Sequence, residues 1–314
     1  MQKFFTLKNT TFQFVLVLLA FVFYHLVFRI FQDSLWGIFV YDLISKIIVL
    51  ALVFGIYYFI ATKYFNIFVN PLNLMISGIL LLAILDVQTN MIYWILIAIF
   101  LIIFKAFIRY QGGPIFNPTM ASIFGLLVVL DVLSFVFRLQ PIDLSVSWWA
   151  GNVLKIFDNL FIQYFLAISI ALVFVYYAYK FKKIYLSISF IIFATVFKII
   201  DLVSFINTFD LGLSDITRLV VDIFLSMVFF SFVMFNEPKT TPIEVTQQVF
   251  YGFVGAFIIF LLQFLPESLS DLHIFYSTEV FITIIVNLIY FLDRYFGVFS
   301  RVEKYLKNFY ENKN

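Results

Sequence analysis

The chain of 314 residues is 64% hydrophobic and only 12% charged, and its mean hydropathy is +1.06. A soluble domain carries about 25% charged residues, so this composition excludes an ordinary soluble protein. The lack of cysteine excludes disulfides, thiolate metal ligands and iron–sulfur clusters held by this chain. The net charge of +2 gives no reason to expect a nucleic-acid partner. The partner that the composition indicates is the lipid bilayer.

Apolar runs recur along the whole chain, and each is long enough to cross roughly 30 Å of hydrocarbon. In chain order we predict ten spans, at about residues 12–32, 38–60, 68–86, 91–108, 117–137, 152–178, 183–203, 214–236, 247–265 and 276–297. The connections are too short for a separate soluble domain. We therefore expect an all-α, polytopic integral membrane protein with about ten transmembrane helices. It forms a single transmembrane domain over residues 1–314, with a basic cytoplasmic tail at 298–314.

Basic residues alternate between the two ends of successive predicted spans. Fourteen of the 20 lysines and arginines fall on one side, and only Arg29, Arg138 and Arg218 fall on the other. Because cytoplasmic loops are enriched in Lys and Arg, this distribution predicts an even number of spans with both termini in the cytoplasm. Twelve spans or eight stay open, although either number would spoil the alternation.

Several charged residues fall inside the predicted spans, where a charge is costly and marks a functional hypothesis. Most have a partner three or four positions along the same helix. The pairs are Lys155 with Asp158, Lys198 with Asp201, and Arg218 with Asp222. We find no partner for Lys46 or Glu279 in their own helices, so we expect them to pair with each other or with another span.

These charges have two interpretations. The pairs either join helices near the outer surface, or they line a polar vestibule that conducts an ion or holds an anionic cofactor. For the second interpretation we predict an ion path with Asp222 and Glu279 as its carboxylates and with Lys155 and Asp158 beside them. Asn287, deeper in the last span, is either an interhelical hydrogen bond or part of a cavity wall.

Two polar breaks interrupt the apolar pattern. The first, at 112–120, reads GGPIFNPTM, and we call it break 1. Its glycines permit positive φ, its first proline stops the preceding helix, and Asn117 is suited to cap the next helix with Pro118 in the first turn. The N–H groups of that helix end suit an anion or a carbonyl-rich ring. An ordinary tight turn with a good cap is the alternative.

The second break, at 236–242, reads NEPKTTP, and we call it break 2. Thr240 or Thr241 is expected to cap the following helix, with Pro242 at its start. The alternation of charge places both breaks on the cytoplasmic side. Irregular backbone in a membrane protein must be buried in protein or line a cavity. We therefore expect the two breaks to mark a site.

Three stretches resemble one known family, the flavoprotein membrane subunit shared by the Na⁺-translocating NADH:quinone reductase (NqrB) and the Rnf ferredoxin:NAD⁺ oxidoreductase (RnfD). Break 1 is similar to the GG…FNPA-M segment of the family. Residues 234–242, MFNEPKTTP, are similar to its MATDP-T-SP segment. Residues 251–255, YGFVG, and 279–293, EVFITIIVNLIYFLD, are similar to its YGxxxG motif and FAILLxN…D ending. The spacing agrees over roughly residues 60–297.

The resemblance implies ten spans in two five-span halves, 12–137 and 152–297, in inverted topology, because an odd number of spans per half inverts the second. It implies a multi-pass protein of the bacterial inner (plasma) membrane. The implied function is that of a membrane subunit of an electron-transport complex, in which flavin-mediated electron transfer drives Na⁺ or H⁺ translocation. Such a subunit is not a complete enzyme, because other subunits must supply the NADH or ferredoxin reaction.

The family attaches FMN through a phosphoester to the threonine of a Ser-Gly-Ala-Thr sequence in an outer loop. The corresponding loop at 143–152, DLSVSWWAGN, has no threonine, so covalent FMN is not expected. FMN or riboflavin held without a covalent bond, and complete loss of the cofactor, both stay open. The candidate cofactor-binding residues are Gly112, Gly113, Asn117, Ser147, Trp148, Trp149, Thr240 and Thr241. The two tryptophans would either stack on the flavin ring or anchor the chain at the interface.

A second function class stays open, a cofactor-free transporter or channel on the same scaffold. The missing attachment motif, the two breaks and the paired intramembrane charges favour it. The sequence has no Walker motif, no Rossmann glycine pattern, no nucleophile elbow and no metal-binding His/Glu spacing. Catalysis by side chains alone is therefore not expected.

Overall fold

The computed structural model describes residues 9–32, 36–64, 69–85, 89–137, 160–208, 227–228, 230–235, 240–266 and 272–298. Over these residues the fold is nearly all helical. The first part contains α1 (Thr10–Gln32), α2 (Trp36–Lys63), α3 (Pro71–Ile84), α4 (Met91–Ala106), the short strands β1 (Arg109–Tyr110) and β2 (Gly113–Pro114), and α5 (Pro118–Phe137). The second part contains α7 (Leu160–Lys180), α8 (Ile184–Thr208), the π-helical turn η1 (Phe230–Met234), α10 (Val245–Leu262), α12 (His273–Tyr276) and α13 (Thr278–Phe296).

The all-α class predicted from the sequence is confirmed over the described residues. Within the described ranges, three helical segments are long and apolar enough to cross a membrane, Val40–Lys63, Pro118–Phe137 and Val245–Leu262. The helices follow the predicted spans closely, except that most of the predicted span 214–236 lies outside the described residues. The chain is therefore a helical protein with membrane-capable helices, and its count of ten spans stays a prediction.

Asparagine caps begin several helices of the first part. The side-chain oxygens of Asn9, Asn70 and Asn90 each accept a hydrogen bond from the backbone N–H two residues later, at 2.9, 3.0 and 3.0 Å. This satisfies one of the N–H groups that a helix start leaves without an intrahelical partner. At the other end of the chain, Gly297 adopts φ 63° and closes α13 through a bond from its N–H to the Asp293 carbonyl. Local chemistry alone therefore sets several helix ends.

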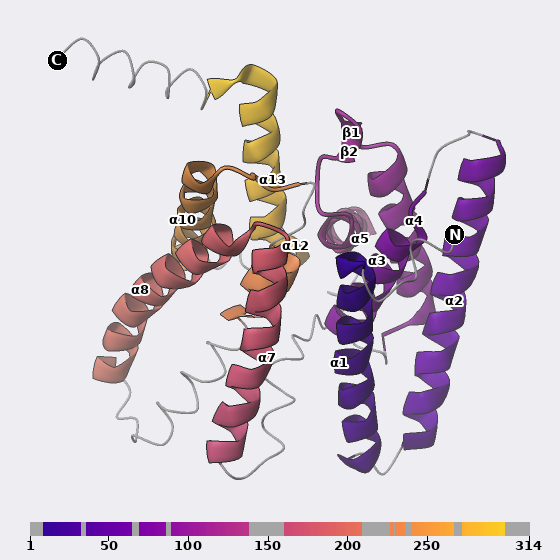
Figure 1. The fold of residues 1–314 in the computed structure, drawn as a ribbon, viewed down its shortest axis with the longest axis horizontal. Helices are drawn as coiled ribbons and strands as arrows, with labels where there is room; N and C mark the ends of the chain where they lie inside the picture. Colours follow the sequence, from indigo (N-terminus) through magenta and orange to yellow (C-terminus); the bar gives the residue numbers. More distant parts are fainter. Residues whose placement is uncertain are drawn as a thin grey trace.

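The helices form two groups joined by α13 (Figure 1). One group contains α1 to α5, and the other contains α7, α8, η1 and α10. Helix α13 packs against both α5 and α10. Phe14 of α1 adds a second link between the groups, because its ring lies 5.1 Å from that of Tyr177 and 5.5 Å from that of Phe181. The last described helix is thus the element on which the two groups meet.

Helix α10 lies very close to α8, and two glycines permit this approach. A Cβ atom at Gly252 would clash with Ser189 Oγ and would lie 2.8 Å from the Leu186 carbonyl oxygen and 2.8 Å from the Phe190 nitrogen. A Cβ at Gly255 would lie 3.3 Å from the Phe190 ring of α8 and 2.9 Å from the ring of Phe235, which follows η1. Small residues at helix interfaces are how membrane proteins bring backbones together. The YGFVG segment is therefore explained by packing.

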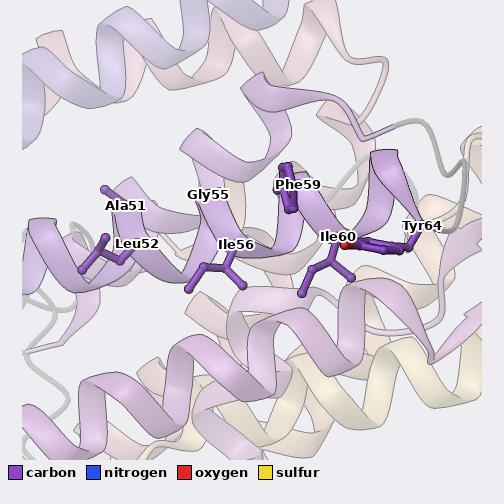
Figure 2. Close-up of a pocket in the computed structure, with 7 residues that line it drawn as sticks. All are labelled: Ala51, Leu52, Gly55, Ile56, Phe59, Ile60 and Tyr64. Carbon is purple, nitrogen blue, oxygen red and sulfur yellow. The ribbon is translucent and has the colours of Figure 1, made fainter.

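Large apolar side chains cover the outside of the molecule. Phe135 is 88% exposed and Phe107 76% exposed. Residues of α2 and the residue that follows it line a shallow open groove: Ala51, Leu52, Gly55, Ile56, Phe59, Ile60 and Tyr64 (Figure 2). A soluble protein rarely exposes so much contiguous apolar surface. The outer faces of these helices, the α2 groove included, suit contact with lipid.

Candidate functional site

Break 1 opens with a tight hairpin. Strands β1 and β2 pair antiparallel, and the two residues between them, Gln111 and Gly112, have φ of 48° and 80°. Two consecutive positive φ values are the geometry of a type I′ turn, which glycine adopts without strain. The positive φ expected at Gly112 is therefore confirmed. Gly113 instead lies in β2, paired with Tyr110, without positive φ.

The hairpin rests on the end of α13. The Tyr110 ring lies 5.3 Å from that of Phe291, and the Arg294 guanidinium lies 5.4 Å from the centre of the Tyr110 ring. Arg294 also donates a hydrogen bond to the side-chain oxygen of Gln111. The two glycines of break 1 thus belong to a hairpin that contacts α13 through Tyr110 and Gln111. This hairpin is separate from the buried part of the break.

Asn117 begins α5 as predicted. Its Oδ1 accepts hydrogen bonds from the N–H groups of Thr119 at 3.1 Å and Met120 at 3.4 Å. Its carbonyl accepts from Ala121 N–H, and Pro118 has no N–H to satisfy. The first turn of α5 therefore has its donors engaged within the chain. The free N–H groups that we expected for an anion are not found at this helix end.

Break 2 presents a row of four consecutive backbone carbonyls, those of residues 240–243, and we call it the carbonyl row. Each carbonyl accepts a hydrogen bond from a side chain. Asn287 Nδ2 donates to Thr240 O at 3.2 Å, Lys183 Nζ donates to Thr241 O at 2.6 Å and to Pro242 O at 2.7 Å, and Gln248 Nε2 donates to Ile243 O at 2.7 Å. Backbone that is not helical thereby has its carbonyls satisfied by the protein's own side chains, as a lipid environment requires.

The carbonyl row also changes the expected helix start. Helix α10 begins at Val245 with Glu244 in the N-cap position, without a side-chain cap among the described residues. Neither Thr240 nor Thr241 therefore caps it, and that prediction is wrong. The physical reason is that residues 240–243 stay irregular, because their carbonyls bond to side chains of α13, of the turn after α7 and of α10 itself.

Asn287 joins the two breaks. Its Oδ1 accepts a hydrogen bond from the backbone N–H of Asn117 at 2.7 Å, while its Nδ2 donates to Thr240 O. Asn287 is 0% exposed and lies near the middle of the 19-residue helix α13. We call this arrangement the Asn287 node. One interpretation of Asn287 was an interhelical hydrogen bond, and this interpretation is confirmed. The two breaks meet at Asn287, roughly 14 Å from the end of α13.

Two residues of the site were not singled out from the sequence. Lys183 is one of the fourteen basic residues counted on the cytoplasmic side, and in the structure it is 1% exposed. Gln248 is equally buried and also donates to Lys182 O at 2.8 Å, while its Oε1 accepts from Leu186 N–H at 3.2 Å. A lysine before an apolar helix is an ordinary interfacial anchor, so no signal in the sequence distinguishes Lys183.

The described candidate residues do not fit a flavin as they stand. Asn117, Thr240, Thr241 and Asn287 are each 3% exposed or less, so the node leaves no open space for a ring system. Most of its polar atoms already have partners. The exception is Thr240 Oγ1, which is buried without a hydrogen-bond partner among the described residues. Ser147, Trp148 and Trp149 lie outside the described residues.

The predicted intramembrane charges are only partly described. Lys155, Asp158 and Asp222 lie outside the described residues, and Glu279 is partly buried at the start of α13. Lys46 was expected to pair with another span, and this is wrong. Its ammonium donates to Asp42 Oδ1 at 3.2 Å, one turn earlier in α2. The i,i+4 rule applies in both directions along a helix, and the earlier residue had not been considered.

No protein-family model matches the chain, and no curated protein matches it significantly.

Proposed function

We propose that this chain is a membrane subunit of an RnfD/NqrB-like electron-transport complex in the bacterial inner membrane, where electron transfer drives Na⁺ or H⁺ translocation. The Asn287 node is the observation that supports it. Each of the three stretches that resemble the family contributes a group to the node: Asn117, Thr240 and Asn287. The two segments of the third stretch, 251–255 and 279–293, also meet, because Tyr251 donates to Asp293 Oδ2 at 3.2 Å. Residues chosen for their resemblance thus hold one another in place.

The position of the node also supports a role in ion movement. Two breaks that meet halfway along a helix resemble the discontinuous helices of transporters, in which sites form near the middle of the bilayer. The carbonyl row is the type of backbone that coordinates cations in such proteins. The proposal therefore assigns the node and the carbonyl row to the ion-translocating part of the subunit.

The flavin of such a subunit would not sit at the node, because the node is closed. The proposal places FMN or riboflavin elsewhere, held without a covalent bond, with Ser147, Trp148 and Trp149 as its candidate contacts. When bound, the flavin would supply the electron chemistry. Other subunits would supply the NADH or ferredoxin reaction.

The test is an absorbance spectrum of the full chain, produced together with a flavin-transfer enzyme and purified in detergent. We expect a flavin band that passes through a filter after denaturation. A band retained with the denatured chain would mean that the flavin is covalently attached. A protein without a flavin band would contradict the electron-transfer proposal and would favour the alternative function described next.

That alternative is a cofactor-free transporter or channel on the same scaffold. The engaged N–H groups of α5 and the closed node favour it, because they leave the described candidate residues without a place for a cofactor. The two functions differ in what drives ion movement. In proteoliposomes, a transporter moves Na⁺ or H⁺ down its gradient with this chain alone, whereas the redox subunit needs its partner subunits and an electron donor.

The proposed ion path is tested with Asp222→Asn. We expect loss of Na⁺- or H⁺-dependent activity in proteoliposomes with folding retained, because the neutral amide cannot exchange a proton or balance a cation. Glu244→Gln, at an exposed carboxylate before α10, is the matched control and should keep its activity. An unchanged rate of Na⁺- or H⁺-dependent activity in Asp222→Asn would show that this carboxylate is not part of the ion path.

A further inference from the structure

Lys183 points its ammonium at backbone carbonyls inside the protein. Its Nζ lies 2.6 Å from Thr241 O and 2.7 Å from Pro242 O, and the residue is 1% exposed. A buried ammonium is costly unless hydrogen bonds replace its hydration. Carbonyl oxygens replace hydration in the same way for the ions of cation-selective channels and transporters. The two carbonyls thus present to Lys183 Nζ the type of ligand that a small cation uses.

We propose that the carbonyls of Thr241 and Pro242 form a binding site for a monovalent cation, and that the Lys183 ammonium occupies this site as a tethered cation. The class of ligand is Na⁺, K⁺ or a small primary ammonium. This inference stands on the geometry of break 2 and does not depend on a redox role of the protein.

The backbone before Lys183 fixes the direction of its side chain. Helix α7 ends in a Schellman motif, with Lys183 N–H bonded to Ala178 O at 2.8 Å and Lys182 N–H bonded to Tyr179 O at 3.0 Å. Lys182 takes the left-handed position of this motif with φ 58°, where glycine is usual. The turn leaves Lys182 exposed and the following lysine buried. The lysine is therefore held in the site by the fold.

The residues on either side of the two carbonyls are held independently of Lys183. On one side, Asn287 fixes the carbonyl of Thr240. On the other, Gln248 bonds to Ile243 O and also to Lys182 O, so it connects break 2 to the turn after α7. Both anchors remain when the lysine side chain is shortened. The carbonyl pair should therefore keep its shape and accept a free cation in the vacated space.

The experiment compares full-length variants in detergent by thermal unfolding. Lys183→Ala removes the ammonium and leaves room for an ion, whereas Lys183→Met removes the charge and keeps the space filled. Lys180→Ala is the control, at an exposed lysine one turn earlier. Each protein is measured in NaCl, KCl, ethylammonium chloride and choline chloride at equal ionic strength, with choline as the cation too large for the site.

We expect Lys183→Ala to be less stable than the parent in choline chloride and to regain stability in at least one of the other salts. At about 100 times the dissociation constant of the cation, mass action raises the Tm by roughly 5–10 °C. The parent, Lys183→Met and Lys180→Ala should show no such selective rise. Equal Tm values for Lys183→Ala in all four salts would overturn the proposal, as would an equal rise in Lys183→Met.

Lys183→Ala is extracted from membranes separately in each salt, so that failure to fold is also informative. Recovery of a single monodisperse peak only in NaCl, KCl or ethylammonium chloride fulfils the expectation. Failure to recover the variant in every salt, while Lys183→Met and Lys180→Ala are recovered, shows that no free cation replaces the ammonium and refutes the proposal.

Discussion

Replacement of Asn287 by leucine tests whether the node holds the two helix groups together. Leucine has the same branched side-chain shape as asparagine, with two methyl groups in place of the amide oxygen and nitrogen, and it removes both hydrogen bonds of the node. The variant strands the N–H of Asn117 and the carbonyl of Thr240 in a site where Asn287 is 0% exposed. Neither group can turn to a new partner easily, since each lies in backbone that other bonds fix.

The size of the effect follows from the number of stranded groups. A buried polar group without a partner costs about 1–3 kcal/mol, while interhelical hydrogen bonds measured in a membrane protein average about 0.6 kcal/mol. Two groups therefore cost roughly 1–6 kcal/mol. We expect the upper half of this range, because both groups belong to the backbone. At about 2–4 °C per kcal/mol, the Tm should fall by more than about 7 °C.

The assay is thermal unfolding of the detergent-purified protein, followed by the monodisperse fraction that remains after heating. Leu288→Ala is the control, because Leu288 is the next residue of α13 and is 36% exposed. Its Tm should change little. The reasoning is refuted if Asn287→Leu unfolds within about 1 °C of the parent, since the node would then contribute almost nothing to the union of the two groups.

Two further substitutions test the packing and the unpaired hydroxyl by the same assay. Gly252→Ala should destabilise the protein by roughly 1–3 kcal/mol, because its Cβ would press on the α8 backbone. The control Gly55→Ala has nothing within 4 Å of its Cβ, so its stability should be unchanged or higher by up to about 1 kcal/mol. Equal stability of the two variants would contradict this account. Thr240→Val should raise the stability by about 1 kcal/mol, because it removes a buried hydroxyl without a partner among the described residues. A loss of stability would mean that this hydroxyl binds a ligand or a residue outside the described ranges.

The features that the sequence predicted well are local ones. The cap at Asn117 and the turn at Gly112 depend only on residues within a few positions, so their residue types identify them. The predicted start of α10 at Pro242 failed for the opposite reason. Thr240 and Pro242 carry a local capping pattern, but their carbonyls bond to Asn287 and Lys183, and these contacts override it.

The candidate site depends on contacts between distant segments. Asn287 meets Asn117 across 170 positions of the sequence, and Lys183 meets Thr241 across 58. No periodicity or spacing indicates such pairs in a single sequence. The sequence identified both breaks and Asn287 as polar positions inside apolar segments. That they form one connected arrangement, and that Lys183 belongs to it, follows only from the fold.

The position of the node has a consequence for biogenesis. Helix α13 leaves the ribosome after both breaks have been synthesised, so the N–H of Asn117 and the carbonyl of Thr240 wait for Asn287 while the earlier helices enter the membrane. Until then the two helix groups lack the helix on which they meet. A nascent chain arrested before α13 should therefore be the species that membrane chaperones and quality-control proteases recognise.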